Sequence, residues 1–393
     1  MQFIKALFSD KILLRILFED LFEIKRKVRS NKFHLDSTMK WLTSAQDNSA
    51  TGGIPRAWDV KNKWLDPYPE TTGYIIPTFI DYYKLTNNQE FLKRAIKMGK
   101  WESCLQLKNG AFPDKTLNSN RPFVFDTAQV IQGFNSLYKN TGEEVWLENS
   151  IKAADWVISK QNKDGSWIRC SNNREPHSYY TRVSWPLMEL AYLKESDKFF
   201  SAAEKNVKWV LSMQKKNGWI DKMSFSESSH SITHTIAYTY EGLLGCNDYI
   251  NNVNVKSESL ELVNRGMEKI LFSFKNNPKW HRNGIPVIFD KDWSPKGNFS
   301  CLPGNAQIAK VWLWLFKISK DRKFFDNAKL LIDQIKMSQI NYDGHIGAVP
   351  GSYPIWGKYG AFSFLNWGAK FFADALIMMI NQQKILKNKD SFE

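Results

Sequence analysis

The sequence is poor in cysteine: four among 393 residues, none at the spacing of a disulfide framework or a zinc site. Cys104, Cys170, Cys246 and Cys301 are too far apart to form a CxxC motif. We therefore expect reduced thiols, no metal site and a cytoplasmic protein.

The chain also lacks a long hydrophobic run. Near the amino terminus, charged residues such as Lys5, Lys11 and Arg15 interrupt every apolar stretch, which argues against a signal peptide or a membrane span. Apolar residues recur there three or four positions apart, so residues 1–32 are predicted to form a basic amphipathic helix. Through residues 1–30 and their KRKVR cluster it could lie on the anionic inner face of a membrane as a peripheral protein. Packing against the main domain, residues 33–393, is an equal alternative.

A third absence concerns nucleic acid. The formal charge of +14 and the pI near 9.3 indicate an acidic partner. Apart from the amino-terminal helix, however, the basic residues are spread along the chain, and no further basic helix or aromatic–basic module is present. We expect no nucleic-acid partner and favour an acidic oligosaccharide or polysaccharide.

What the sequence does contain is a recurring turn. With 43% hydrophobic residues the chain can bury a large core. A polar stretch followed by glycine, as in KQNKDGSW, recurs roughly every 60 residues, a period suited to a pair of helices with a connecting loop. Each glycine is predicted to take a left-handed conformation after a helix. The six are Gly53, Gly110, Gly165, Gly218, Gly284 and Gly344.

Between these turns, pairs of segments carry helical apolar spacing. One example is residues 126–142 followed by residues 143–161. Four further pairs follow the same pattern, and the carboxyl-terminal segment, residues 363–383, would find its partner near the start, at residues 36–46. Six helical hairpins closed in this way predict an all-α fold, an (α/α)6 toroid whose first helices line the inside.

Candidate site residues gather where the inner helices are predicted to begin, since those ends converge and their free N–H groups favour anions. The catalytic candidates are Glu70, Asp126, His177, Tyr180, His234 and Tyr238. The candidates for substrate binding are Tyr74, Gln129, Arg182, His230, Asn305, Gln307, Tyr353 and Trp356.

Plainer roles exist for some of these residues. Asp126 could simply cap its helix. His230 and His234 are four apart, but no third ligand stands at a recognisable spacing, so neither a metal nor another cofactor is expected.

The turn QNKDGSW, residues 161–167, matches the Q-x3-G-x-W pattern of triterpene cyclases, and the predicted toroid resembles theirs. The resemblance implies a terpene cyclase-like activity. The acidic Asp-x-Asp-Asp run of those enzymes is absent, since DKDW at residues 290–293 does not supply it.

The segments YPETTGY and GNAQ resemble parts of the glucuronyl C5-epimerases, and the His, Tyr, Arg and Asn set resembles uronate-directed polysaccharide lyases. The resemblance implies a base that removes the proton next to a carboxylate. His177 or His234 would be that base. Tyr180 or Tyr238 would be the acid, and Arg182 with Asn305 would hold the carboxylate.

A second pattern, Glu70 and Asp126 at the starts of successive inner helices, resembles toroid glycoside hydrolases, including the unsaturated glucuronyl hydrolases. There two carboxyl groups do the acid–base work. From the sequence we favour the epimerase or lyase reaction, in the biosynthesis of an acidic polysaccharide or lipid-linked glycan. The alternatives are the hydrolase, a non-catalytic glycan-binding toroid and a cyclase-like enzyme.

Overall fold

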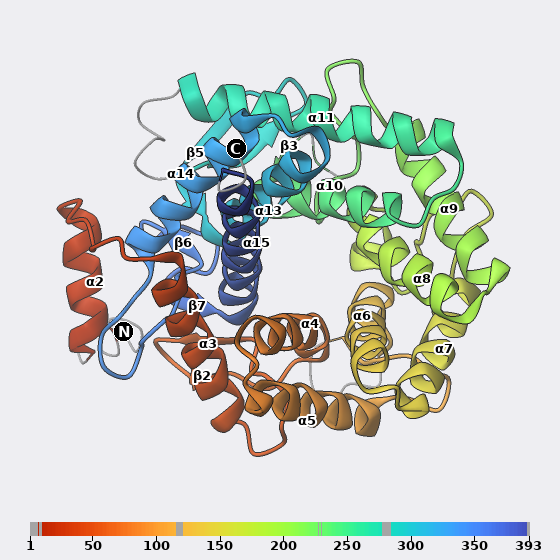
Figure 1. Cartoon of the computed structure of the whole chain (residues 1–393), viewed down its shortest axis with the longest axis horizontal. Helices are drawn as coiled ribbons and strands as arrows, with labels where there is room; N and C mark the ends of the chain where they lie inside the picture. The colour runs from red at the N-terminus through yellow and green to blue at the C-terminus, as the bar shows by residue number, and fades with distance from the viewer. Residues whose placement is uncertain are drawn as a thin grey trace.

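The computed structural model describes residues 7, 10–114, 121–226, 228, 230–276 and 284–390. Within these ranges a closed ring of helices surrounds a central axis (Figure 1). The inner helices are α4 (Pro69–Thr86), α6 (Val124–Thr141), α8 (Thr181–Lys194), α10 (Thr233–Asn247), α13 (Leu302–Ser319) and α15 (Asn366–Asp390). Each contacts the next, and α15 contacts α4, so the ring is complete.

An outer layer packs around this ring. It consists of α5 (Gln89–Leu105), α7 (Glu144–Ser159), α9 (Asp197–Ser212), α11 (Val253–Asn276), α14 (Arg322–Ser338) and α3 (Asn31–Asp47). The first five each pack on the inner helix that precedes them, whereas α3 packs on α15 from the other end of the chain. The predicted (α/α)6 toroid, including its closure by the first helix, is confirmed.

The two layers differ in the distribution of their apolar residues. Helix α10 is buried along its whole length, while the outer helix α14 buries one face that includes Phe324, Leu331 and Ile335. A helix that is covered on all sides needs residues that are small, apolar, or polar with their hydrogen bonds made inside the protein. An amphipathic helix needs only one apolar stripe. The main hydrophobic core therefore lies between the layers.

The recurring turns connect neighbouring hairpins. After α7, the side-chain amide of Gln161 donates to Gly165 O at 3.1 Å and to Ala202 O of α9 at 2.8 Å. Gln106 donates in the same way to Gly110 O and to Asn149 O of α7. Each of these glutamines therefore ties the end of one outer helix to the middle of the next.

The turn glycines are required by conformation and by space. Gly110 and Gly165 have φ of 91° and 97°, and a Cβ on either would lie 2.2 Å or 2.5 Å from a backbone oxygen of the next outer helix. These glycines lie in the turns that follow the helices rather than at the helix ends. In the first turn the prediction was wrong by one residue, because Gly52 rather than Gly53 has the positive φ.

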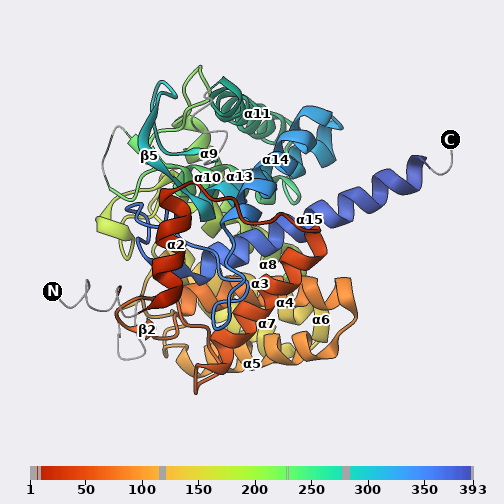
Figure 2. The same cartoon turned by 90° about the vertical axis from the view of Figure 1, so that its left-hand side faces the viewer.

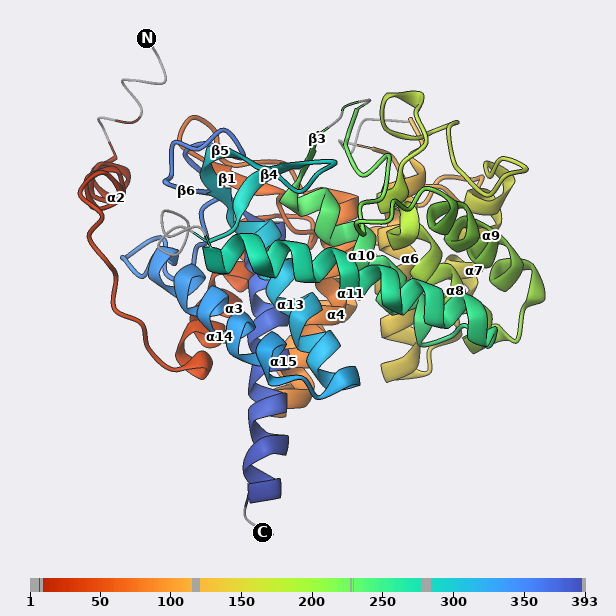
Figure 3. The ribbon, with the colours of Figure 1, turned by 90° about the horizontal axis from the view of Figure 1, so that it is seen from above.

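Two small antiparallel sheets cover one end of the ring (Figure 3) and were not predicted. The first has the order β2 (Lys63–Trp64), β1 (Ala57–Asp59), β7 (Ser363–Leu365). The second has the order β3 (His230–Ile232), β4 (Pro286–Asp290), β5 (Pro295–Cys301), β6 (Ser352–Tyr353). They form where loops from distant repeats meet, and the carboxyl end of α15 projects from the opposite end of the ring (Figure 2).

The amino-terminal helix is shorter than predicted. Helix α2 (Lys11–Leu21) ends well before residue 32, and residues 24–30 are not helical; residues 1–6, 8 and 9 lie outside the described residues. Leu13 and Ile16 are buried against the toroid, and Asp20 accepts a hydrogen bond from Ile355 N at 2.8 Å. The predicted division of the chain at residue 33 stays a prediction. No described helix combines the length and the apolar character that a membrane span requires.

Replacing Gly110 by alanine tests the close contact between this turn and the next outer helix, α7. Gly142 is the control because its φ is also positive, 71°, but a Cβ there meets no atom within 4 Å. We expect Gly142→Ala to cost about 1–2 kcal/mol from backbone strain alone. Gly110→Ala should cost about 1–3 kcal/mol more, because the turn must move away from Lys152 O. Urea unfolding measures both, and equal costs would contradict the close approach.

Candidate active site

A cavity of about 380 Å3 opens where the inner helices begin. We call it the loop-side cavity. Its lining comprises carboxylates, arginines, a histidine and several aromatic rings. They are Arg56, Tyr68, Glu70, Tyr74, Asp114, Arg121, Phe123, Phe125, Asp126, Ser171, Asn172, Asn173, Tyr179, Phe225, His234, Tyr238, Tyr359 and Trp367.

Two carboxyl groups from successive inner helices face this cavity in different surroundings. Asp126, in the first turn of α6, is buried and accepts a hydrogen bond from the Tyr68 hydroxyl at 2.9 Å. Glu70, in the first turn of α4, forms no hydrogen bond with a described residue, and burial raises its pKa to about 7 despite the nearby Arg182. Glu70 can therefore carry a proton at neutral pH.

His234 stands in a defined tautomer. Burial lowers its pKa to about 4, so the ring is neutral. Gln307 donates through Nε2 to the Glu241 carboxylate, so its Oε1 must accept from His234 Nδ1 at 2.6 Å. The proton is thus on Nδ1. Nε2, which forms no hydrogen bond with a described residue, carries a free lone pair.

Tyrosine hydroxyls supply most of the remaining polarity. The Tyr238 hydroxyl is buried and has no hydrogen-bond partner in the described structure, while its ring lies 4.3 Å from that of His234, centroid to centroid. Tyr359 accepts a hydrogen bond from Trp367 Nε1 at 3.2 Å. Burial raises the pKa of both tyrosines well above 10, so both hydroxyls stay protonated at neutral pH and can donate hydrogen bonds.

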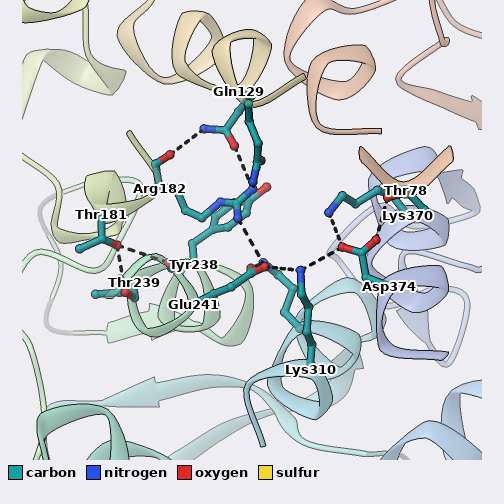
Figure 4. A network of polar contacts seen from close by, with 12 residues as sticks. Thr78, Gln129, Thr181, Arg182, Tyr238, Thr239, Glu241, Lys310, Lys370 and Asp374 are labelled. Carbon is teal, nitrogen blue, oxygen red and sulfur yellow. Dashed lines mark hydrogen bonds and ion pairs between the residues drawn. The ribbon is translucent and has the colours of Figure 1, made fainter. Parts of the chain in front are cut away.

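A chain of alternating charges lies in the interior below this cavity (Figure 4). Lys310 Nζ contacts Glu241 Oε1 at 2.8 Å and Asp374 Oδ2 at 3.0 Å. Arg182 Nη1 approaches Glu241 from the other side at 3.4 Å, and Lys370 pairs with Asp374. Burial alone would raise the pKa of Glu241, but Lys310 and Arg182 lower it to about 2, so this carboxylate stays ionised. We call these five residues the floor network.

Several predicted site residues come together in the cavity: Glu70, Tyr74, Asp126, His234 and Tyr238. Others lie just below or behind its lining. Gln307 positions His234, and Arg182 belongs to the floor network, where its guanidinium also donates to Gln129. Asn305 is fully buried and lies next to Gly284.

The remaining predicted residues lie elsewhere. Both ring nitrogens of His177 face backbone oxygens, Ser224 O at 2.9 Å and Asn172 O at 2.8 Å, and so hold two loops together. The loop that holds Asn172 and His177 contains η1 (Asn172–Arg174) and η2 (Ser178–Tyr180). Tyr180, the last residue of η2, is fully buried. His230, on β3, contacts Lys296. Tyr353 and Trp356 are also absent from the cavity lining.

Tyr68 was missed by the sequence analysis, although it stands two residues before Glu70 in YPETTGY. Arg56 and Arg121 were also missed, because both come from loops whose position no helical periodicity indicates. In the described residues no group of three or more histidine, cysteine, aspartate or glutamate side chains is arranged to hold a metal ion.

Comparison with known proteins supports the fold. A family model described as the squalene-hopene cyclase C-terminal domain matches residues 53–244. No curated protein sequence matches the chain. Structural neighbours are (α/α)6-toroid enzymes. An unsaturated glucuronyl hydrolase specific for heparin has a TM-score of 0.68 and 15% identity over 90% of this chain and 99% of that one.

A sugar epimerase from a ruminal bacterium has a TM-score of 0.69 and 11% identity over 89% of this chain and 98% of its own. A polysaccharide lyase has a TM-score of 0.66 and 12% identity over 90% and 98%. At these identities the similarity establishes the toroid fold, and function must be argued from the site.

Removing one charge tests the floor network. Lys310→Met leaves Glu241 and Asp374 short of a cation in a buried position, so the free energy of unfolding should fall by about 3–5 kcal/mol. Lys329→Met, on the exposed side of α14, is the control and should stay within about 0.5 kcal/mol of the unmodified protein. A similar small effect at Lys310 in urea unfolding would contradict the assignment.

Proposed function

We propose that this protein is a carbohydrate-active enzyme that hydrolyses a glycosidic bond near the end of an acidic glycan. The observation that carries the proposal is the pair of carboxyl groups, Glu70 and Asp126, which face one cavity in contrasting environments. Pairs of titratable groups with separated pKa values are how acid and base roles are divided.

In this reaction Glu70 donates its proton to the leaving oxygen as the glycosidic C–O bond breaks. The Asp126 carboxylate removes a proton from the water that attacks the anomeric carbon, so a new C–OH bond replaces the old one. The Tyr68 hydroxyl, which donates to Asp126, orients that carboxylate. Aromatic rings such as Phe125 and Trp367 offer flat surfaces for a sugar ring.

Two features support a short acidic substrate. Small-molecule pockets span about 300–1,000 Å3, and the loop-side cavity, at about 380 Å3, suits the end of a glycan rather than a long segment. Arg56 and Arg121 stand in the same lining and can pair with a sugar carboxylate.

The epimerase or lyase reaction favoured from the sequence becomes the second candidate. It is supported by His234 Nε2 and the Tyr238 hydroxyl, neither of which has a hydrogen-bond partner among the described residues, on two rings that pack against each other. It ranks second because Arg182 and Asn305, the residues expected to hold the carboxylate, do not line the cavity.

The pH dependence distinguishes Glu70 as the acid. Its pKa of about 7 implies that activity falls as the pH rises above 7, because the proton is lost. Glu70→Gln should lower kcat by roughly 10²–10⁴-fold and remove that alkaline limb, and Asp126→Asn should lower kcat similarly. Cleavage of uronic-acid oligosaccharides is measured by proton NMR in heavy water. Glu148→Gln, on the exposed side of α7, is the control.

The same NMR spectra separate the candidates. Loss of cleavage in both carboxyl variants supports the hydrolase. Deuterium at C5 or a new C4–C5 double bond, retained in Glu70→Gln and lost in a His234 variant, would instead establish proton abstraction. Substrate binding without any reaction would indicate the glycan-binding toroid.

We also propose that the amino-terminal segment contacts an anionic membrane surface on the cytoplasmic side. While Leu13 and Ile16 face the toroid, Phe18, Leu21 and Phe22 are 54%, 62% and 61% exposed. The exposed Lys25, Lys27 and Arg29 follow, whereas Arg26 pairs with Glu19 and Asp20 of the protein itself. Exposed aromatic and aliphatic residues beside lysine and arginine match the interface of an anionic bilayer.

Vesicle co-sedimentation tests this contact. Phe18→Ser with Phe22→Ser should reduce binding to phosphatidylserine-containing vesicles at least tenfold, because two apolar anchors are lost. Phe272→Ser, at an exposed apolar position on α11, is the matched control. Equal binding by all variants, or no binding of the unmodified protein, would contradict the proposal.

A further inference from the structure

A second and larger cavity, of about 670 Å3, lies at the opposite end of the ring. We call it the far-side cavity. It is lined near the carboxyl ends of the inner helices, for example by Leu85 of α4, Asn140 of α6 and Ile385 of α15. The floor network contributes Lys310, Lys370 and Asp374 to its wall, so it lies on the other side of that network from His234.

Lysine dominates the charge of this cavity. Six lysines line it against three carboxylates, Asp81, Glu189 and Asp374. The lysines come from α4, α6, α13 and α15, and are Lys84, Lys139, Lys310, Lys317, Lys370 and Lys384. Thus helices that are distant in sequence bring an excess of positive charge to one open cavity.

Three of these lysines form no ion pair with a described residue, although at longer range Asp81 attracts Lys84 and Asp248 attracts Lys317. Lys139 pairs with Glu189, and Lys310 and Lys370 pair with Asp374. Among the described residues, neither Lys84, Lys317 nor Lys384 forms an ion pair. Their side chains are exposed, so they can reorient toward a ligand.

Helix ends account for only part of this arrangement. Lys84, Lys139 and Lys317 lie in the last turns of their helices, where a cation offsets the negative end of the helix dipole. That explanation does not extend to Lys310, Lys370 and Lys384, which lie further inside α13 and α15. Lys310 and Lys370 are paired with carboxylates of the floor network, so Lys384 is the one of the six whose charge neither a helix end nor an ion pair with a described residue accounts for.

We propose that the far-side cavity binds a small multivalent anion of the phosphate type. The lysine ammonium is a compact point charge that suits phosphate oxygens, and several of them around one cavity favour an anion of more than one charge. The cavity volume lies within the range of small-molecule sites and leaves room for an organic part against Trp185 and Ile377.

The protonation of Lys370 provides a way to detect binding of an anion in this cavity. Burial, together with the nearby cations Lys310 and Arg182, outweighs the attraction of Asp374 and Glu241 and lowers the pKa of Lys370 to about 8. A bound anion favours the charged ammonium, so binding near pH 8 must be accompanied by uptake of a proton.

Titration calorimetry with pyrophosphate tests the proposal on the full chain. We expect saturable one-to-one binding that weakens at least tenfold in the variant Lys84→Gln, Lys317→Gln, Lys384→Gln. The control variant, Lys152→Gln, Lys205→Gln, Lys329→Gln, removes the same charge from exposed positions on α7, α9 and α14 and should bind within twofold of the unmodified protein. Repeating the titration at pH 8 with sulfate, a divalent anion whose own protonation does not change near that pH, in buffers of different ionisation enthalpy measures the proton uptake by the protein.

Equal weakening in the two triple variants would show that only overall charge matters and would overturn the proposal, as would absence of saturable binding. If the first triple variant fails to fold, Lys317→Gln alone against Lys329→Gln makes the same comparison. Binding without proton uptake at pH 8 would also overturn the site, because the ligand would then lie away from Lys370.

Discussion

The charge balance among Arg182, Glu241, Lys310, Asp374 and Lys370 is the constraint on which the interior depends. Inner helices buried on all sides cannot tolerate an unpaired charge, so three cations and two carboxylates hold each other in place. The network links α8, α10, α13 and α15 across the ring axis. It thereby separates two cavities that a ring of helices would otherwise join.

The same network reaches the candidate site through one side chain. The ionised Glu241 fixes the orientation of the Gln307 amide, and Gln307 then fixes the tautomer of His234. A buried charge pair that contributes little net stability can in this way define the state of a base some distance from it. Glu70, by contrast, has no such partner, and its altered pKa comes from burial.

The fold was predictable because its determinants are local and repeated. Helical spacing identified the hairpins, and turns such as KQNKDGSW marked their boundaries. The candidate site was predictable in part, since Glu70, Asp126 and His234 begin inner helices and so converge. His177 and Arg182 show the limit: a residue near a helix start can point to a neighbouring loop or to the ring axis, and only side-chain packing decides which. The two small sheets depend on contacts between loops from distant repeats, and these leave no local pattern.

Closure of the ring by its first and last helices has a consequence for synthesis. Helix α3 leaves the ribosome first among the ring helices, yet its partner α15 is the last to be made. Until then α3, whose residues Leu35, Met39 and Leu42 are fully buried in the finished protein, lacks the inner helix on which it packs. Domains generally fold from the amino terminus as they emerge, and exposed apolar surface promotes aggregation. The face of α3 that packs on α15 therefore stays exposed until α15 has been synthesised. In a chain that ends before α15, this face stays exposed permanently.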